Sequence, residues 1–376
     1  MARKSHKNVG LIGLGIIGSR VAASLRNAGY HVYVWNRSPR AEPNFLGNAA
    51  EVAEVCNIIQ IFVSDAQAVF ETIDAFADRL TPSHTILCNA TIGPEATQEA
   101  ARLVQMCGAK FLDAPFTGTK GAAEKGQLVY YIGGADDVLR QVEPVLQASS
   151  KAIVKIGEIG SAATLKIATN MIGAVTVQVL AEALALVKGA GIDPENLANA
   201  LENHGVRSPL MDLKLAGMLK GEFPPHFSMK HMFKDVQIGL HMANSRDLDL
   251  PATTAAAGIL YDGMSRGWAE MDFSAVVKIY GDMQKAALPP TAEPEKALPA
   301  PEKPAPEKPA EEKPAEEPPP AAIAPKEAKE VNEINEVNEE EPTFSGEPSK
   351  PDSPAEAEAE KPEDRPKGFR WPFGKK

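Results

Sequence analysis

The sequence predicts an α/β fold, with a doubly wound N-terminal Rossmann domain followed by an all-helical C-terminal domain and a disordered tail. Short apolar runs alternate with helical stretches as far as residue 160, as in a mostly parallel sheet covered on both faces. Beyond that point no strand-like run follows, and 20 of the 31 prolines fall in the last 90 residues. We therefore predict domains at 1–160 and 161–286 and a tail at 287–376.

The elements of the first domain follow from its hydrophobic pattern. An apolar run over 7–12 predicts a strand, the amphipathic 19–28 a helix, and the β-branched and aromatic 30–35 a second strand. Further strands are expected at 58–63, 85–88, 111–113 and 129–132, and further helices at 66–79 and 94–107. This succession begins with a βαβ unit, the building block of a doubly wound sheet.

The second domain has helical patterns only. Residues 162–190 are apolar nearly all round, as a central buried helix would be, and the polar Gln178 and Glu182 argue against a membrane span. Asp193 and Pro194 predict a capped helix start with proline at the first helical position. Two prolines at 224–225 then break the chain before helical stretches at 229–244 and 251–266.

Charge and cysteine content exclude several classes of protein. A net charge of −11 gives no footprint for nucleic acid, and three cysteines argue against a secreted disulfide scaffold. The histidines lack metal-ligand spacing, so no metal site is expected: His204, His226, His231 and His241. We expect a cytoplasmic protein. Five bases and three aromatics in 365–376 fit weak docking on an anionic membrane or an acidic partner as well as an inert terminus.

A glycine cluster directly follows the first predicted strand and opens a helix, as Gly13-Leu14-Gly15-Ile16-Ile17-Gly18. In this context glycines permit a tight turn and close backbone approach to the pyrophosphate of a dinucleotide; a plain turn is the alternative. The second strand ends in Asn36-Arg37-Ser38, where an NAD enzyme would place an acid. A guanidinium here suits a 2′-phosphate and favours NADPH over NADH, unless Arg37 is an ordinary surface base.

Two further segments have the residue types of a reaction site. Thr117, Gly118 and Thr119 lie in a glycine-rich loop after a strand, which suits either an anion such as a substrate carboxylate or close packing. Lys166 and Asn170, four residues apart, share a face of the long apolar helix. Burial beside a nicotinamide would lower the pKa of this lysine toward neutrality, as a general acid needs. A lysine extending to solvent is an equal alternative.

Several ordered motifs together resemble a known family. They lie at 10–18, 113–119, 157–166, Lys234-Asp235 and 267–275. Over residues 9–285 the chain is similar to the β-hydroxyacid dehydrogenases, which include 3-hydroxyisobutyrate dehydrogenase, tartronate semialdehyde reductase and the glyoxylate/succinic semialdehyde reductases. The resemblance implies a cofactor fingerprint, a substrate motif, a catalytic motif, a second cofactor motif and a C-terminal signature, in that order.

The same resemblance implies roles for individual residues. Lys166 would protonate the carbonyl oxygen, and Asn170 would hold Lys166 or the substrate. The substrate would be bound by Thr117, Gly118, Thr119, Phe227 and Asp235. The dinucleotide would be bound by Gly13, Leu14, Gly15, Ile16, Ile17, Gly18, Asn36, Arg37, Ser38, Val63, Ser64, Thr91 and Lys234.

The chain departs from the family pattern at several positions. Thr117 replaces a serine, Cys88 an acid, Ala90 a serine and Ala162 a glycine. Thr119 followed by a lysine is more similar to the glyoxylate/succinic semialdehyde reductases. We therefore expect an NADPH-dependent reductase of a small aldehyde or keto acid, forming a homodimer or homotetramer.

Two alternatives stay open. One is an imine reductase, although such enzymes tend to replace the lysine at position 166. The other is a cofactor-binding scaffold whose tail recruits partners, which an intact Lys166 and Asn170 disfavour.

Overall fold

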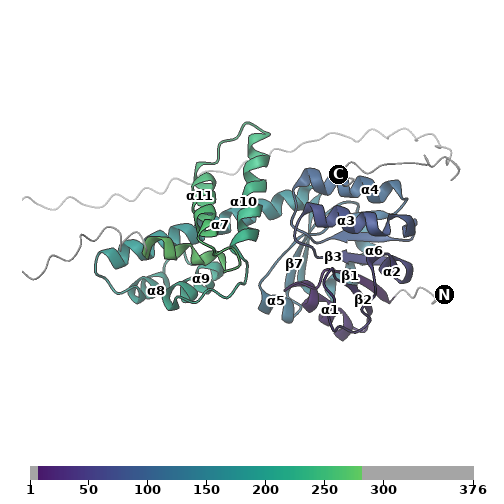
Figure 1. Ribbon diagram of the computed structural model, residues 1–376, viewed down its shortest axis with the longest axis horizontal. Coiled ribbons are helices and arrows are strands. Elements are labelled where there is room, and N and C mark those ends of the chain that lie inside the picture. The colour runs from purple at the N-terminus through teal and green to yellow at the C-terminus, as the bar shows by residue number, and fades with distance from the viewer. Residues whose placement is uncertain (1–6, 282–376) are drawn as a thin grey trace, which may run out of the picture. The chain divides into compact units, whose positions relative to one another are not determined.

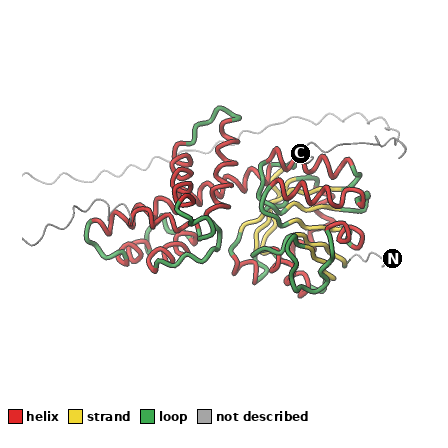
Figure 2. Tube along the Cα trace, viewed as in Figure 1, coloured by secondary structure: helices red, strands yellow, loops and turns green. Residues whose placement is uncertain are grey.

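The structure is a computed structural model that describes residues 7–281, so the predicted tail at 287–376, with its basic end at 365–376, lies outside the described residues. Within that range all strands belong to the N-terminal part, as Figure 2 shows in yellow. They are β1 (Asn8–Ile12), β2 (His31–Trp35), β3 (Ile58–Ile61), β4 (Thr85–Cys88), β5 (Lys110–Asp113), β6 (Phe116–Thr117), β7 (Leu128–Gly133) and β8 (Ser150–Gly157). The expected succession of strands and helices is confirmed.

The strands form one eight-stranded sheet in the order β2-β1-β3-β4-β5-β7-β6, with β8 paired to β7. Pairing is parallel from β2 through β5 and between β7 and β8, and antiparallel where β7 meets β5 and β6. The sheet is therefore mixed, with a parallel doubly wound half. β1 lies between β2 and β3 and is buried along its whole length. The strand order reverses at β1, because β2 lies on one side of it and β3 on the other. Doubly wound folds bind their ligands at such a switch point.

Helices cover this sheet (Figure 1): α1 (Gly18–Asn27), α2 (Ala49–Val55), α3 (Ala66–Phe76), the 3-10 turn η1 (Ala77–Arg79), α4 (Pro94–Met106), α5 (Lys120–Glu124) and α6 (Asp136–Gln147). Several begin at a polar cap. The side chain of Asn48 accepts from the Glu51 N–H, and that of Asp65 from the Ala68 N–H. Such caps satisfy backbone donors that a helix start leaves unpaired.

The second part is helical, as predicted. It contains α7 (Ser161–Gly189), α8 (Glu195–Leu201), α9 (Pro209–Lys220), α10 (Met229–Asn244), α11 (Pro251–Ser265) and the 3-10 turn η2 (Phe273–Val276). Buried side chains of α7, α9, α10, α11 and η2 form one hydrophobic core. The first part has its own core on the sheet.

Helix α7 is long and apolar enough to cross a membrane by length and composition, in contrast to the expectation from Gln178 and Glu182. It nevertheless packs against α9, α10, α11 and η2, and the central helix of a folded domain meets the same criteria. Its outward side is apolar as well: Ile172, Val179 and Leu186 are 68%, 54% and 75% exposed. The prediction of a helix apolar nearly all round is confirmed, but one of its faces is exposed.

Several elements differ from the sequence-based prediction. No strands were predicted at β6 and β8, and Lys151 and Lys155 interrupt the apolar pattern of β8. No helices were predicted at α2, α5, α6 and α9. Helix α8 begins at Glu195 with Pro194 at the cap position, one residue later than predicted, and Asp193 Oδ1 accepts from the Glu195 N–H as the predicted cap would.

Candidate active site

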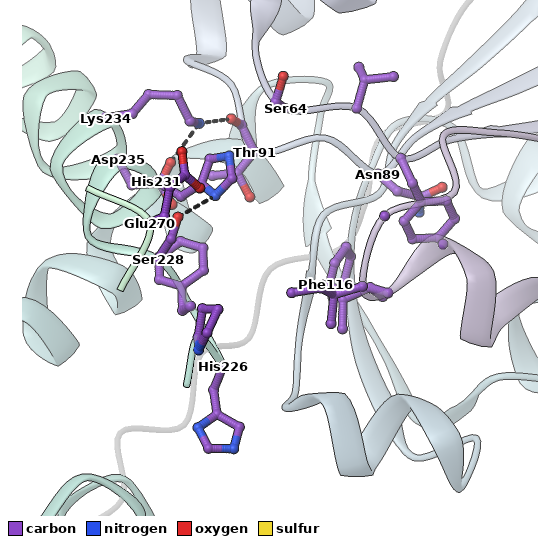
Figure 3. Close-up of a pocket in the computed structure, with 18 residues that line it drawn as sticks. Ser64, Asn89, Thr91, Phe116, His226, Ser228, His231, Lys234, Asp235 and Glu270 are labelled. Carbon is purple, nitrogen blue, oxygen red and sulfur yellow. Dashed lines mark hydrogen bonds and ion pairs between the residues drawn. The ribbon is translucent and has the colours of Figure 1, made fainter. Parts of the chain in front are cut away.

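A cavity of about 330 Å³ lies between the loops at the carboxyl ends of the strands and helix α10 (Figure 3). One wall comes from the glycine turn after β1 and the loops after β3 and β4. The other wall comes from the 225–228 segment and the first turns of α10. The predicted site residues that line it are Gly15, Ile16, Ile17, Gly18, Val63, Ser64, Thr91, Phe227, Lys234 and Asp235. Most of the predicted cofactor residues are thus brought to one cavity.

The glycine turn has the shape that a dinucleotide needs. Gly13 has φ +97°, and a Cβ there would lie 2.1 Å from the Phe62 carbonyl oxygen. A Cβ at Gly18 would lie 2.0 Å from the Gly13 carbonyl oxygen, whereas at Gly15 it would meet nothing within 4 Å. Two glycines therefore close the turn, and Gly15 leaves its backbone open to the cavity. A pyrophosphate fits such an open backbone.

This contrast predicts different effects of adding a methyl group. Gly15→Ala is expected to fold normally but to weaken NADPH binding about tenfold or more, because the methyl fills space that a ligand would use. Fluorescence titration with NADPH measures the loss. The matched control is Gly258→Ala, in an exposed and equally open position of α11. It should leave binding unchanged and raise stability by about 0.5–1 kcal/mol. Equal binding by both variants would contradict the assignment of Gly15.

The residues after β2 divide into a structural and an exposed group. The Leu14 N–H donates to Asn36 Oδ1 at 2.9 Å, and Asn36 Nδ2 donates to the Ser38 carbonyl at 2.8 Å. Leu14 is fully buried in the core, so it does not line the cavity. Leu14 and Asn36 therefore hold the turn together. Arg37 and Ser38 are exposed, and the Arg37 guanidinium is available to an anion.

The loop after β3 also lies near positive charge. Ser64 lines the cavity and donates to Asp65 Oδ2 at 2.6 Å. Burial alone would raise the pKa of Asp65, but hydrogen bonds from Ser64 and Ala68 and the charges of Lys234 and Arg37 hold it below its usual range. The two cations are therefore close enough to act on the same loop.

A chain of contacts joins the predicted catalytic and cofactor residues. Lys234 Nζ donates to the Thr91 carbonyl oxygen at 2.5 Å and lies 2.7 Å from Asp235 Oδ1. Figure 3 draws both interactions as dashed lines. Asn170 Nδ2 donates to the other carboxylate oxygen of Asp235 at 2.6 Å. Asn170 does not line the cavity itself, but it is coupled to a residue that does.

Lys166 lies one helical turn before Asn170 on α7 and is half-buried. Burial lowers the pKa of Lys166 to about 8, opposed by the carboxylate of Asp235 and reinforced by the charge of Lys234. The lysine therefore changes protonation close to neutral pH, as a general acid/base requires. Like Asn170, it is not among the residues that line the cavity, and it is connected to the cavity through the charges of Lys234 and Asp235.

The position of Lys166 depends on Asp113 at the end of β5. Its Oδ2 accepts from the Gly160 N–H at 3.0 Å and from the Ala163 N–H at 2.9 Å, at the start of α7. Burial raises the pKa of Asp113 to about 6, although hydrogen bonds from the backbone of α7 oppose the rise. Asp113 thus anchors the helix that carries Lys166 to the sheet.

None of the predicted substrate residues Thr117, Gly118 and Thr119 lines the cavity, although Phe116 directly before them does. Gly118 has φ +141°, and a Cβ there would lie 2.7 Å from Leu128 Cδ2. Thr119 Oγ1 accepts from the Ala122 N–H and caps α5. The hydroxyl of Thr119 is therefore engaged in the helix cap, while Thr117 and Gly118 lie beside the cavity wall without lining it.

Sequence reasoning missed several residues of the cavity wall. Apart from Phe116, they are Phe62, Asn89, Pro225, His226, Ser228, His231 and Glu270. His226 and His231 lack metal-ligand spacing, and the sequence gives no other signal for them. Within the described residues no group of three or more His, Cys, Asp or Glu side chains could hold a metal ion. The two prolines at 224–225 interrupt the helical pattern and so indicate a loop. This loop could have been proposed as part of the site, because binding residues often lie in loops between rigid elements.

The glycine turn after β1 has the geometry of a dinucleotide-binding site. Residues 8–157 match the NAD binding domain of 6-phosphogluconate dehydrogenase, and residues 160–280 match the NAD-binding domain of NADP-dependent 3-hydroxyisobutyrate dehydrogenase. The chain belongs to the 3-hydroxyisobutyrate dehydrogenase-like, or β-hydroxyacid dehydrogenase, family. The predicted resemblance is confirmed.

Relatives agree with this assignment. The chain is 30% identical over 279 residues to 2-hydroxy-3-oxopropionate reductase of Escherichia coli, covering 72% of this chain and 96% of that protein. It is 27% identical to the chloroplastic glyoxylate/succinic semialdehyde reductase 2 of Arabidopsis thaliana, over 72% of this chain and 78% of the relative. It spans about half (51%) of the cytokine-like nuclear factor N-PAC of Mus musculus, at 27% identity over 73% of this chain.

A solved structure shares the fold. The 3-hydroxyisobutyrate dehydrogenase of Mycobacterium tuberculosis superposes with a TM-score of 0.67 at 23% identity, covering 72% of this chain and 98% of that one. The described residues therefore have the two-part fold of that structure.

Proposed function

We propose that this protein is an NADPH-dependent reductase of a small aldehyde or keto acid of the glyoxylate or succinic semialdehyde class, with Lys166 as the general acid. The observation that carries the proposal is a cavity with the open glycine turn on one wall and Lys234 and Asp235 on the other, whose charges act on Lys166 and leave it with a pKa of about 8. An ordinary surface lysine would stay charged and would not be coupled to Asp235 and Lys234.

The residues of the chain then have distinct tasks. When bound, NADPH supplies the hydride for the carbonyl carbon. Lys166 donates its Nζ proton to the carbonyl oxygen as that oxygen gains negative charge, and takes a proton back in the oxidation direction. Asn170 donates a hydrogen bond that fixes the carboxylate of Asp235. The negative charge of Asp235 in turn keeps the pKa of Lys166 from falling further. Thr117 and Gly118 are the proposed partners of the substrate carboxylate, and Lys234 holds the loop of Thr91.

The cofactor preference is proposed to depend on Arg37. Its guanidinium is exposed just after β2, and no acid replaces it at the position that would hold a ribose 2′-OH. Arg37→Ala is expected to raise KM for NADPH about 10- to 100-fold, because charge-assisted hydrogen bonds are lost, and to leave KM for NADH unchanged. Initial rates with both cofactors measure this. Arg140→Ala, exposed on α6, is the control. A parallel rise for both cofactors would contradict the role.

The activity itself is tested with the purified full-length chain. Oxidation of NADPH and NADH is followed with glyoxylate, succinic semialdehyde, tartronate semialdehyde and methylmalonate semialdehyde. Turnover of at least one substrate with NADPH supports the proposal. Turnover of cyclic imines alone would instead indicate an imine reductase, and tight NADPH binding with no turnover would indicate a cofactor-binding scaffold.

We also propose that the protein is a homo-oligomer that buries the outer face of α7. Ile172, Val179 and Leu186 are spaced seven residues apart and lie on one side of the helix, where all three are more than half exposed. A stripe of exposed large apolar side chains on one helix face is typical of an interaction surface. The stripe fits a second copy of the same helix, so a homodimer or homotetramer is the proposed state.

A further inference from the structure

Ser228 and His231 form a pair at the first turn of α10 that the proposed mechanism does not use. Ser228 occupies the N-cap position, but its side chain makes no capping hydrogen bond. Its Oγ lies 2.8 Å from Nδ1 of His231 instead. Serine is favoured at N-caps because its oxygen satisfies a free backbone N–H. Here the Ser228 hydroxyl makes no capping hydrogen bond and instead orients the imidazole of His231.

The ring of His231 is held on a second side by Phe227. The two rings stack with centroids 6.1 Å apart and an interplanar angle of 26°. Ser228, Phe227 and His231 all line the cavity, and Figure 3 shows the imidazole between Ser228 and the Lys234–Asp235 pair. The imidazole is therefore fixed from two sides in the wall of the candidate active site.

One nitrogen of this ring has no partner among the described residues. Nδ1 is bound to Ser228, and the geometry of the ring places Nε2 on the side away from that hydroxyl. No hydrogen bond or ion pair of Nε2 occurs within residues 7–281. His231 Nε2 is not among the buried side-chain atoms that lack a partner, so it is open to solvent in the cavity, where a ligand can replace water as its partner.

The charge state of His231 limits what that partner can be. Burial, then the positive charges of Lys230 and Lys234, lower the pKa of His231, while Asp235 and Glu270 oppose the shift. The imidazole is therefore neutral at neutral pH. If Ser228 donates to Nδ1, Nε2 carries the hydrogen and donates; if Nδ1 donates to Ser228, Nε2 accepts. A hydroxyl group can serve either tautomer, whereas an alkyl group can serve neither.

We infer that His231 Nε2 hydrogen-bonds a hydroxyl substituent of the substrate, so that the site selects hydroxylated aldehyde acids over their alkyl analogues. This inference rests on the proposed reduction of a small aldehyde acid, and within that group it favours hydroxylated members over glyoxylate and succinic semialdehyde, which have no hydroxyl substituent. A site that bonds a hydroxyl disfavours the analogue without it, because the bound ligand shields the polar group from water and then leaves it unpaired.

Two aldehyde acids of nearly equal size test the inference. Tartronate semialdehyde has a hydroxyl at C2, and methylmalonate semialdehyde has a methyl there. We expect kcat/KM to favour the hydroxyl compound by about 10- to 100-fold in the natural protein, and by less than about threefold in His231→Leu. His231→Gln, which keeps a donor near the position of Nε2, is expected to retain most of the preference. No preference in the natural protein, or an unchanged preference in His231→Leu, would overturn the inference.

Ser228→Ala provides a second test that does not depend on the leucine variant folding. It should weaken the preference through loss of ring orientation and lower Tm only slightly, because this hydroxyl does not cap α10. Ser208→Ala is the matched control, since Ser208 Oγ caps α9 by accepting from the Met211 N–H. It should lower Tm by the usual amount for a lost cap and leave the preference intact. His241→Leu, exposed on the same helix as His231, should change neither property.

Binding measurements separate this inference from the proposed function. Calorimetry of glycerate and 3-hydroxyisobutyrate, the two products, compares hydroxyl with methyl without any turnover. Tighter binding of glycerate that is lost in His231→Leu supports the role of His231 even if no aldehyde acid is reduced. Turnover that depends on Lys166, together with equal binding of the two products, would leave the proposed function intact and refute the role of His231.

Discussion

Lys166→Met is expected to lower kcat for carbonyl reduction by about 10²- to 10⁴-fold, the usual contribution of a positioned general acid. Methionine fills a similar volume but carries no proton, so the fold and the cavity wall should be retained. NADPH affinity, measured by fluorescence titration, should stay within about twofold, because Lys166 does not line the cavity. Initial rates at saturating cofactor measure the loss of activity.

The pH profile of the natural protein tests the same assignment in a different way. Lys166 must be protonated for reduction, so the rate should be constant below its pKa of about 8 and fall as the pH rises above it. Oxidation of the product requires the neutral amine, so its rate should rise through the same pH. In Lys166→Met both dependences should disappear.

Lys188→Met is the matched control, because Lys188 is exposed in the last turn of the same helix. It should change neither kcat nor the pH profile. If kcat and the pH profile of Lys166→Met were both as in the natural protein, and so the same as in Lys188→Met, Lys166 would not be the general acid. The cavity would then need another proton donor.

The fold and half of the site could be predicted because their signals are local. The glycine turn combines a fixed spacing with a strand before it and a helix after it, and each part is visible in a short window. Met229–Asn244 and Thr85–Cys88 were predicted with the bounds that the structure has. Strand β8 was missed because its pairing with β7, rather than its own pattern, determines that it is a strand.

The other wall of the cavity could not be predicted because distant residues position it. The 225–228 segment has no regular pattern, and its location depends on contacts with residues about 45 positions later. His231 is not among the predicted site residues, because its position along the chain gives no signal beyond the absence of metal-ligand spacing. The relevant signal was Ser228 three residues earlier, but a serine before a helix predicts a cap, and only the structure shows that it binds the imidazole instead.

Asp272 is the residue that holds this second wall in place. Its side chain, on a residue that is 2% exposed, accepts from Lys214 Nζ at 2.8 Å, from the His226 N–H at 3.0 Å and from the Phe227 N–H at 3.1 Å. Burial alone would raise the pKa of Asp272, but Lys214 and these hydrogen bonds hold it below its usual range. The carboxylate therefore stays ionised in the interior. The stability that it contributes is present above its unfolded pKa of about 4 and is lost as the pH falls below that value.

Asp272→Ala is expected to destabilise the protein by about 3–5 kcal/mol, because Lys214 would remain buried with its charge unpaired. For a domain of this size the loss corresponds to a decrease in Tm of about 6–20 °C, which calorimetry measures. KM for the aldehyde acid should also rise, since the backbone of Phe227 loses its anchor beside the cavity. NADPH affinity should change less, because the glycine turn lies on the opposite wall.

The matched variants separate the charge from the hydrogen bonds. Lys214→Met leaves the carboxylate with the His226 and Phe227 N–H groups, so it should cost less than Asp272→Ala. Lys214→Met combined with Asp272→Asn removes both charges and keeps one acceptor oxygen for the backbone. This double variant should be the most stable of the three, because a buried pair without charge avoids the desolvation penalty. If Asp272→Ala were destabilised by less than about 1 kcal/mol, solvent would have to reach Lys214, and Asp272 could not be what positions the 225–228 segment.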